Sequence, residues 1–164
     1  MAGLGALIFS IMVLGSIGAV NPELEQIPVA KVLKEGFPSV RYGHADVHIV
    51  GWYAELAGDC VGDSGGADAS VAWLQRECPL RVLLPAQPSE TVTQVQLEQE
   101  GLRLEAPTGG PFPPRAGPGG PNLRLEQLVF VGHFDDPAAA GCIPERVDRC
   151  RNTFVVSDYT GLIR

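Results

Sequence analysis

Positive charge is scarce in this 164-residue chain. Twelve Lys and Arg residues stand against nineteen Asp and Glu residues, which gives a formal net charge of −7 at pH 7. A protein that follows nucleic-acid phosphates carries a basic face, and so few cations do not supply one. The composition therefore argues against nucleic acid as a partner.

Metal-binding cysteine patterns are also missing. The four cysteines, Cys60, Cys78, Cys142 and Cys150, show no CxxC spacing, and no histidine stands at zinc-finger spacing from them. An even number of cysteines in two local pairs is typical of a disulfide framework in an exported chain. Because near neighbours close small loops, we predict the pairs Cys60–Cys78 and Cys142–Cys150, although other connectivities stay open. We predict no metal and no other cofactor.

Long uncharged stretches are missing too, with one exception at residues 3–20. A transmembrane helix needs about 17 to 25 apolar residues, so this stretch is long enough to span a bilayer. A cleaved signal peptide requires a basic segment before the apolar stretch, and no basic residue precedes this one. No lipobox cysteine is present either. We therefore predict a signal-anchor helix over residues 1–20. Secretion after signal cleavage is the first alternative, and a buried helix is the second.

Residues 21–43 are predicted to be a connector because prolines and glycines interrupt them, with one helical turn at Val29–Leu33. Lys31, Lys34 and Arg41 are the positive charges near the predicted span. The positive-inside rule would place this flank in the cytoplasm, whereas disulfide-forming cysteines place the following domain outside. We give more weight to the cysteines and predict a membrane-anchored domain on the extracytoplasmic side.

The rest of the chain carries several β-strand patterns. Ala45–Leu56 is apolar on both faces, which is typical of a central or barrel-forming strand, and Gly51 within it predicts a bulge or a sharp bend. Thr91–Leu97 alternates in polarity and is interpreted as a strand, with a helix across Val92–Leu102 as the alternative. Further strands are expected at Arg81–Leu84, Leu128–Phe134 and Asn152–Tyr159.

Five or six short strands with a bent first strand predict a mainly β fold for residues 44–164. We expect a small OB-like β-barrel, preceded by the hydrophobic N-terminal helix. One or two short helices are expected, at Val71–Cys78 and Pro144–Arg149. The Pro/Gly-rich tract at residues 108–121 is expected to form a long surface loop, in which Phe112 is a candidate partner contact.

Residues 60–66 read CVGDSGG and resemble the CxGDSGG signature of trypsin-like serine proteases. In that family the serine, here Ser64, is the nucleophile, and nearby backbone N–H groups form the oxyanion hole. The family also needs a histidine and an aspartate upstream on a much longer chain, and its AAHC-type histidine motif is absent here. We therefore predict that Ser64 is not a nucleophile and that the segment is a flexible loop.

Four other residues are candidates for a binding site. Trp52 and Tyr53 are the best ligand-stacking residues, although one of them is also expected in the core and the other over the barrel rim. His133 and Asp135 share a face if the strand continues to Asp135, so they suggest two ligands of a metal site or an acid–base pair. A polar strand end is the alternative. No third supporting group is found, so we name no catalytic residue.

One further arrangement stands near the end of the sequence. It consists of HFDDP at 133–137, two cysteines at 142 and 150, and FVV at 154–156. It is similar to a segment of exported, membrane-anchored bacterial proteins of unknown function. The resemblance covers residues from about 125 onwards and implies an envelope location without a defined activity. We expect a non-catalytic binding module for a protein or small ligand. The alternative is a hydrolase or metal-dependent enzyme that uses His133 and neighbouring acids.

Overall fold

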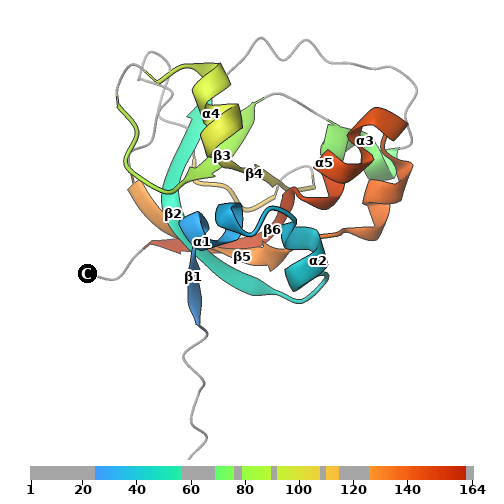
Figure 1. Ribbon diagram of the computed structural model, residues 1–164, viewed down its shortest axis with the longest axis horizontal. Coiled ribbons are helices and arrows are strands. Elements are labelled where there is room, and N and C mark those ends of the chain that lie inside the picture. Colours follow the sequence, from blue (N-terminus) through green and yellow to red (C-terminus); the bar gives the residue numbers. More distant parts are fainter. Residues whose placement is uncertain are drawn as a thin grey trace, which may run out of the picture.

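The computed structural model describes residues 25–56, 69–75, 79–89, 92–107, 110–114 and 126–161. These residues form a mixed six-stranded sheet with short helices, so the predicted mainly β class is confirmed (Figure 1). The strands are β1 (Gln26–Pro28), β2 (Val47–Leu56), β3 (Leu80–Leu84), β4 (Leu102–Glu105), β5 (Glu126–His133) and β6 (Phe154–Gly161). The α-helices are α1 (Val29–Lys34), α2 (Pro38–Tyr42), α3 (Ala69–Gln75), α4 (Gln94–Glu100) and α5 (Val147–Arg151), and the 3₁₀-helices are η1 (Pro137–Gly141) and η2 (Pro144–Arg146).

Five of the strands are paired in a ring. The sheet order is β1-β2-β3-β4-β6-β5, and β2 also pairs with β5. The first part of β2 lies beside β5 and β1, and its second part lies beside β3. The β1–β2 and β4–β6 pairs are parallel, and the other pairs are antiparallel. The long strand β2 curves through the molecule and connects the two parts of the sheet (Figure 1).

One face of these strands encloses the main core. Side chains alternate along a strand, so Ile49 and Tyr53 of β2 point inward and are 0 % and 1 % exposed. Phe130 lies 5.4 Å from Tyr53 between ring centroids, and Phe134 lies 5.0 Å from Phe154. Burying each large side chain of this kind stabilises the fold by about 1.5–3 kcal/mol. The main core consists of Val29, Val32, Ile49, Tyr53, Leu83, Leu102, Leu104, Ala106, Leu128, Phe130, Phe134, Phe154 and Val156.

Gly51 allows α1 to approach β2 closely. A Cβ atom at this position would lie 2.7 Å from Val29 Cγ1 and 2.7 Å from Leu83 Cγ, which no side chain tolerates without movement. The register of β2 runs through Gly51 without a shift, so the predicted bulge is not there. A register shift lies instead in the β5–β6 pairing, where Ser157 of β6 is the extra residue opposite Val131 and Gly132.

The connector assignment is wrong for residues 26–42, which are part of the fold. β1 pairs with β2, and Ser39 Oγ of α2 donates a hydrogen bond to Asn152 Oδ1 at 2.8 Å. The predicted helical turn at Val29–Leu33 is confirmed by α1. Val29 and Val32 are three residues apart and therefore lie on one helix face, which is buried in the main core.

The strand predicted at Thr91–Leu97 is also wrong, because α4 occupies this part of the chain. The alternative of a helix within Val92–Leu102 is the one found. Its N-terminus is a capping box in which Gln96 N donates to Thr93 Oγ1 at 3.3 Å and Thr93 N donates to Gln96 Oε1 at 3.0 Å. These bonds satisfy backbone donors that the first helical turn leaves free. Leu97 is fully buried, whereas Val95 is 59 % exposed. The alternating pattern thus does not correspond to two faces of a strand.

The other predicted elements are confirmed as strand or helix, although their bounds differ. Strands are found at β2, β3, β5 and β6, and helical turns are found at α3 and at η2 with α5. In the Pro/Gly-rich tract the structure describes residues 110–114, which form neither helix nor strand. Phe112 of this tract packs on the protein itself, with its ring 6.3 Å from that of Phe130 and 4.2 Å from the guanidinium carbon of Arg81.

Several predictions concern residues outside the described part of the chain. They include the anchor helix at residues 3–20, the GDSGG loop with Ser64, and the Cys60–Cys78 disulfide. Among the described residues, no helix has the length and apolar character needed to cross a membrane.

Candidate functional site

His133 lies where the end of β5 meets the turn that leads into β2. Phe134 N donates to Gly43 O at 2.9 Å and fixes the two segments together. His133 Nε2 lies 3.3 Å from Asp136 Oδ2, and His133 Nδ1 lies 3.8 Å from Asp46 Oδ1. The imidazole is therefore placed between two carboxylates from different parts of the chain.

The side chain of Asp135 contacts α5 and the turn before β2. Its backbone has a φ of +51°, a left-handed conformation that Asp tolerates better than most residues. Its Oδ1 lies 3.4 Å from Arg151 Nε, its Oδ2 lies 3.9 Å from His44 Nε2, and its N–H donates to Arg151 O at 2.9 Å. The strand ends at His133, so strand alternation does not carry Asp135 onto the predicted shared face.

These groups connect four neighbouring parts of the fold. We call them the polar joint and define it as His44, Asp46, His133, Asp135, Asp136 and Arg151. Asp136 also caps η1, because its Oδ1 accepts a hydrogen bond from Ala138 N at 2.7 Å. Among the residues that the structure describes, no group of three or more His, Cys, Asp or Glu side chains is arranged to hold a metal ion. The observed contacts connect β5, η1, α5 and the turn before β2.

Tyr53 and Trp52 occupy different environments. Tyr53 is buried in the main core, and its hydroxyl donates to Glu55 Oε2 at 2.8 Å. Burial, together with the negative charge of Glu55, raises the pKa of the Tyr53 hydroxyl. Trp52 points to the opposite face of β2 and is half-buried against a second apolar cluster. This α4 cluster consists of Ala54, Leu80, Val82, Leu84 and Leu97.

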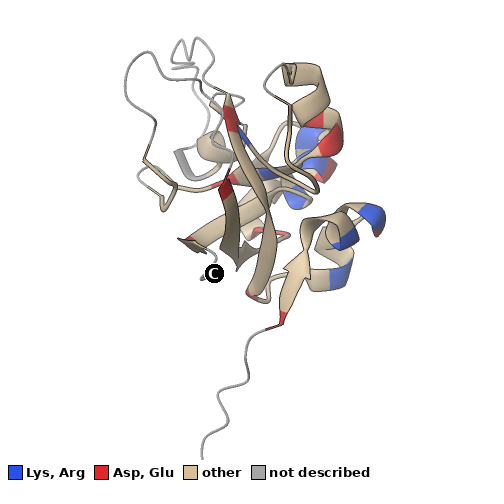
Figure 2. Cartoon of the chain, turned by 90° about the vertical axis from the view of Figure 1, so that its left-hand side faces the viewer, with Lys and Arg blue, Asp and Glu red and all other residues tan. Residues whose placement is uncertain are grey.

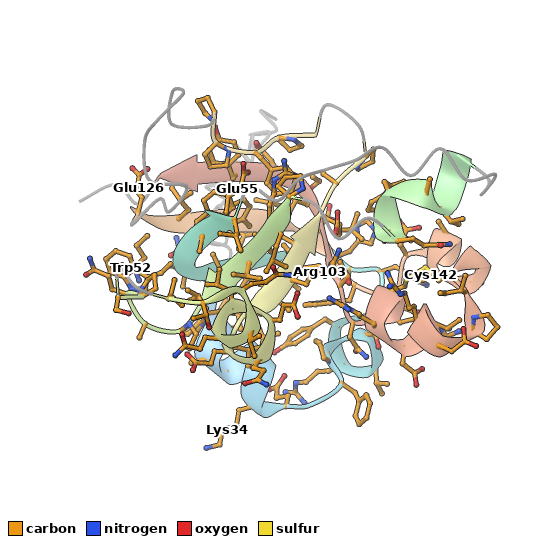
Figure 3. The ribbon with its side chains drawn as sticks, turned by 90° about the horizontal axis from the view of Figure 1, so that it is seen from above. Lys34, Trp52, Glu55, Arg103, Glu126 and Cys142 are labelled. Carbon is orange, nitrogen blue, oxygen red and sulfur yellow. A yellow bond between two sulfur atoms is a disulfide. The ribbon has the colours of Figure 1, made fainter. Side chains whose placement is uncertain are left out.

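Two ion pairs, each between a buried glutamate and a partly buried arginine, lie on β2, β3 and β4 and were not predicted from the sequence. Glu55 and Arg81 stand directly opposite each other in the β2–β3 register, with 2.8 Å between Glu55 Oε2 and Arg81 Nε. Arg103 and Glu105 are two residues apart on the opposite face, with 2.7 Å between Arg103 Nη2 and Glu105 Oε1. Figure 3 shows Glu55 and Arg103 within the body of the protein. Buried charges of this kind persist only when they are paired and hydrogen-bonded.

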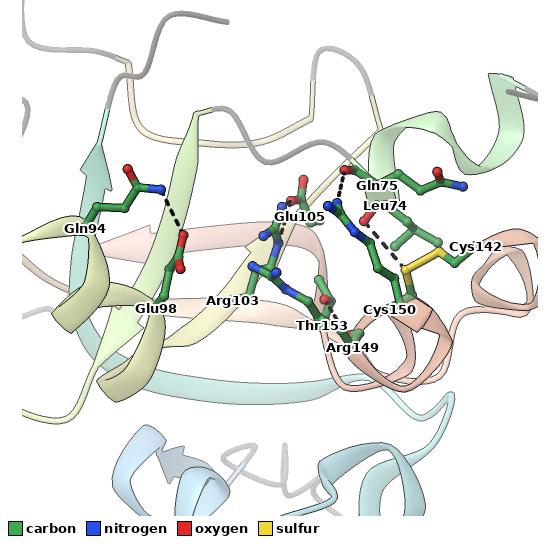
Figure 4. Close-up of polar contacts among 11 residues, drawn as sticks. Leu74, Gln75, Gln94, Glu98, Arg103, Glu105, Cys142, Arg149, Cys150 and Thr153 are labelled. Atoms are coloured by element: carbon green, nitrogen blue, oxygen red, sulfur yellow. Dashed lines mark hydrogen bonds and ion pairs between the residues drawn. A yellow bond between two sulfur atoms is a disulfide. The ribbon is translucent and has the colours of Figure 1, made fainter. Parts of the chain in front are cut away.

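Glu105 is a buried acidic residue at the end of β4. Burial raises the pKa of its carboxyl to about 7, although Arg103, Arg81 and Arg149 each favour the charged form and oppose this shift. Figure 4 places the Arg103–Glu105 pair between α4 on one side and Arg149 with the disulfide on the other. The residue therefore lies at the boundary between the ring of strands and the segment that follows β5.

The predicted disulfide Cys142–Cys150 is confirmed. It closes the loop from Cys142 to Cys150, which contains η2 and most of α5. Together with η1, this loop forms the segment at residues 137–151, which we call the disulfide-braced unit. The unit packs on α3 through a third apolar cluster, and Arg146 Nη1 donates to Gln75 O at 3.2 Å. In return, Gln75 Nε2 donates to Gly141 O at 3.3 Å. The disulfide cluster consists of Leu74, Ala139, Cys142, Cys150 and Val155.

Comparison with protein-family models, with curated proteins and with solved structures finds no match to this chain. The contacts described above therefore carry the inferences about function.

Proposed function

We propose that this chain is a non-catalytic, extracytoplasmic binding module, held at a membrane by residues 3–20. The observation that carries the proposal is the Cys142–Cys150 disulfide within the disulfide cluster. Both cysteines are buried, at 6 % and 2 % exposure, and their cross-link closes a loop of short helical turns. Structural disulfides of this kind persist in oxidising compartments and are rare in the cytosol of mesophiles.

The ring of strand pairings supports an OB-like β-barrel as the framework of this module. An OB-fold is a five-stranded barrel that binds ligands on its second and third strands and on two flanking connections. In the ring β2-β3-β4-β6-β5, the corresponding connections are β2 to β3, which carries α3, and β5 to β6, which carries the disulfide-braced unit. These connections pack on each other, so they present a preformed surface beside the ring.

Ile143 is the best marker of that surface. It follows Cys142 directly and is 45 % exposed, although the disulfide and η2 hold the backbone on either side. A rigid, exposed apolar side chain binds a partner with little loss of conformational freedom. We propose that the disulfide-braced unit, together with α3, contacts a protein or a small ligand.

Thiol labelling in intact cells tests the compartment. A full-length chain with Cys60→Ser and Cys78→Ser keeps only Cys142 and Cys150, so every signal comes from this pair. After rapid acid quenching, we expect no alkylation by maleimide before reduction and alkylation of both cysteines after it. Two free thiols in the quenched cells would contradict the extracytoplasmic location.

Photo-crosslinking tests the binding surface. The photoreactive residue p-benzoylphenylalanine replaces Ile143 in one full-length variant and Val95 in a matched control, because Val95 of α4 is similarly exposed at 59 %. We expect a defined cross-linked product from position 143 and none from position 95. Equal products from both positions, or no product from position 143, would argue against this surface.

A hydrolase or metal-dependent enzyme is the second candidate function. It is favoured by the contact of 3.3 Å between His133 Nε2 and Asp136 Oδ2, since a carboxylate that orients a histidine is common in acid–base catalysis. His133→Gln distinguishes the two functions. A binding module keeps its cross-linking at position 143 in this variant, whereas an enzyme loses its turnover.

The GDSGG segment gives a separate test of the non-catalytic proposal. We predict that a fluorophosphonate probe does not label Ser64 in the folded chain, because no histidine and aspartate of the protease pattern precede it in the sequence. Intact-mass measurement after incubation with the probe gives the result, and Ser64→Ala is the control. Stoichiometric labelling that disappears in the control would show a reactive nucleophile.

A further inference from the structure

The helices α1 and α2 carry an exposed surface that combines positive charge with apolar side chains. Lys31, Lys34 and Arg41 are exposed, and Figure 2 shows that the basic residues of α1 and α2 lie on one flank of the domain. Phe37 and Val40 lie between them in sequence and are 64 % and 86 % exposed. We call these five residues the basic flank.

The fold holds the basic flank in place. Val29 and Val32 are buried in the main core, so the opposite face of α1, with Lys31 and Lys34, is turned outward. Figure 3 shows Lys34 pointing away from the body of the protein. Gly36 has a φ of +81° and forms the turn between the helices, which brings Phe37 to the surface directly before α2.

The charge on this flank is net positive in an acidic protein. Glu35 is its internal acid, and it accepts a hydrogen bond from Tyr42 Oη at 2.7 Å and pairs with Arg41 Nε at 3.2 Å. Glu25 is a second acidic residue nearby in sequence. Lys31 and Lys34 are exposed and lie in the last turn of α1, where the helix dipole favours cations. An anionic surface complements this arrangement.

The sequence sets a short distance between this flank and the proposed membrane span. Residues 21–25 separate the apolar stretch at 3–20 from β1, and five residues extend over at most about 18 Å. The basic flank begins in α1, which follows β1 directly. Because α1 has six residues, its length is only about 9 Å. If residues 3–20 span the bilayer, this flank lies within reach of the lipid headgroups.

We propose that the basic flank docks onto the anionic surface of the bilayer that anchors the chain, with Phe37 and Val40 inserted among the headgroups. This inference rests on the proposed membrane anchor. Exposed aromatic and aliphatic side chains flanked by Lys and Arg are the composition that binds membrane interfaces, and basic residues beside a span are attracted by anionic lipids. Docking also gives a role to Lys31, Lys34 and Arg41, which the positive-inside rule alone would place on the cytoplasmic side of the membrane. The disulfide-braced unit then binds its partner from a domain whose orientation relative to the membrane is fixed.

Lipid cross-linking of the full chain tests this proposal. Phe37→p-benzoylphenylalanine is reconstituted in vesicles of mixed phosphatidylglycerol and phosphatidylcholine, with Val95→p-benzoylphenylalanine as the control of similar exposure. We expect a phospholipid adduct at position 37 and none at position 95. Lys31→Gln with Lys34→Gln, vesicles of phosphatidylcholine alone, or high salt should each lower the adduct about fivefold or more.

The outcomes separate this proposal from the anchor. A chain that does not float with the vesicles overturns the anchor and the docking together. A chain that floats but gives no lipid adduct at position 37, or gives equal adducts at positions 37 and 95, overturns the docking alone. An adduct to a second copy of the chain, or an adduct that is insensitive to lipid charge, salt and the lysine substitutions, also overturns it.

Discussion

The ring of strands and the disulfide-braced unit are stabilised by different interactions. The ring encloses large side chains that come from distant parts of the sequence, among them Tyr53, Phe130 and Phe154. The unit at residues 137–151 has helical segments of three to five residues and buries small groups such as Ala139. Helices this short are unstable alone. A cross-link and side-chain hydrogen bonds to α3 therefore add to the smaller apolar cluster that holds the unit in place.

The largest expected effect comes from the centre of the ring. Phe130→Ala removes a fully buried aromatic side chain that contacts Tyr53 and Tyr159. We expect the free energy of unfolding to fall by about 3–5 kcal/mol, because the variant loses apolar burial and leaves a cavity. Urea unfolding followed by circular dichroism measures this. Phe37→Ala on the exposed flank is the control, and a similar loss in both variants would refute the core role of Phe130.

A pH-dependent effect is expected at the boundary of the two regions. The pKa of Glu105 in the folded protein is about 7, above its ordinary value of 4.5. Between these two pKa values, the Glu105 carboxyl is therefore protonated in the folded state and ionised in the unfolded chain. The associated stability is fully present below about pH 4.5 and is lost as the pH rises through about 7, with a total of about 3 kcal/mol.

Comparison with Glu105→Gln isolates this contribution. The difference in unfolding free energy between the wild type and Glu105→Gln should change by about 3 kcal/mol between pH 4.5 and pH 8. Glu98→Gln is the control, because Glu98 is exposed on α4. A difference that stays constant with pH would show that Glu105 titrates normally.

The disulfide should have a smaller and local effect. Replacing Cys142 and Cys150 by serine opens a loop with a sequence separation of 8 residues, which the chain-entropy model values at about 2–3 kcal/mol. We expect faster amide hydrogen exchange in the disulfide-braced unit and α3, and unchanged exchange in β2 and β5. Equal acceleration in both regions would mean that the unit and the ring unfold together.

The smallest expected effect concerns α4, which has neither a cross-link nor a place in the main core. Thr93→Ala removes the side-chain acceptor of its capping box and should cost about 1 kcal/mol. Thr93→Ser keeps the hydroxyl and should cost much less. Thermal unfolding of the three proteins measures the difference, and equal losses in both variants would exclude a capping role.

The sequence predicts elements whose signal is local and misses those that depend on packing. Leu128–Phe134 combines β-branched and aromatic residues, so β5 was recognisable. The helix α4 was given only as the alternative to a strand because Val95 and Leu97 alternate with polar residues, although Thr93 and Gln96 form a capping-box pattern that identifies a helix. α1 was taken as part of a connector because its burial requires β2 and Gly51, which the local sequence does not contain.

The candidate site residues also divide into those that a local signal identifies and those whose contacts depend on the fold. His133 was identified, but its contact with Asp46 joins positions far apart in the chain and needs the β2–β5 pairing. Asp135 was misplaced because its positive φ turns the chain at the end of β5. The ion pair of Glu55 and Arg81 depends on the register of β2 against β3. Tertiary geometry decides the first and the third of these cases, and the local backbone conformation decides the second.

The position of β6 has a consequence for how the chain folds. β6 pairs with β4 on one side and with β5 on the other, and it is the last of the described strands in the sequence. During synthesis from the N-terminus, β4 and β5 each keep one open edge until residues 154–161 emerge, and open edges promote aggregation. The parallel β4–β6 pairing also joins segments about 50 residues apart, so its formation is slow. The edges of β4 and β5 are therefore the part of the ring most exposed to aggregation until β6 is in place.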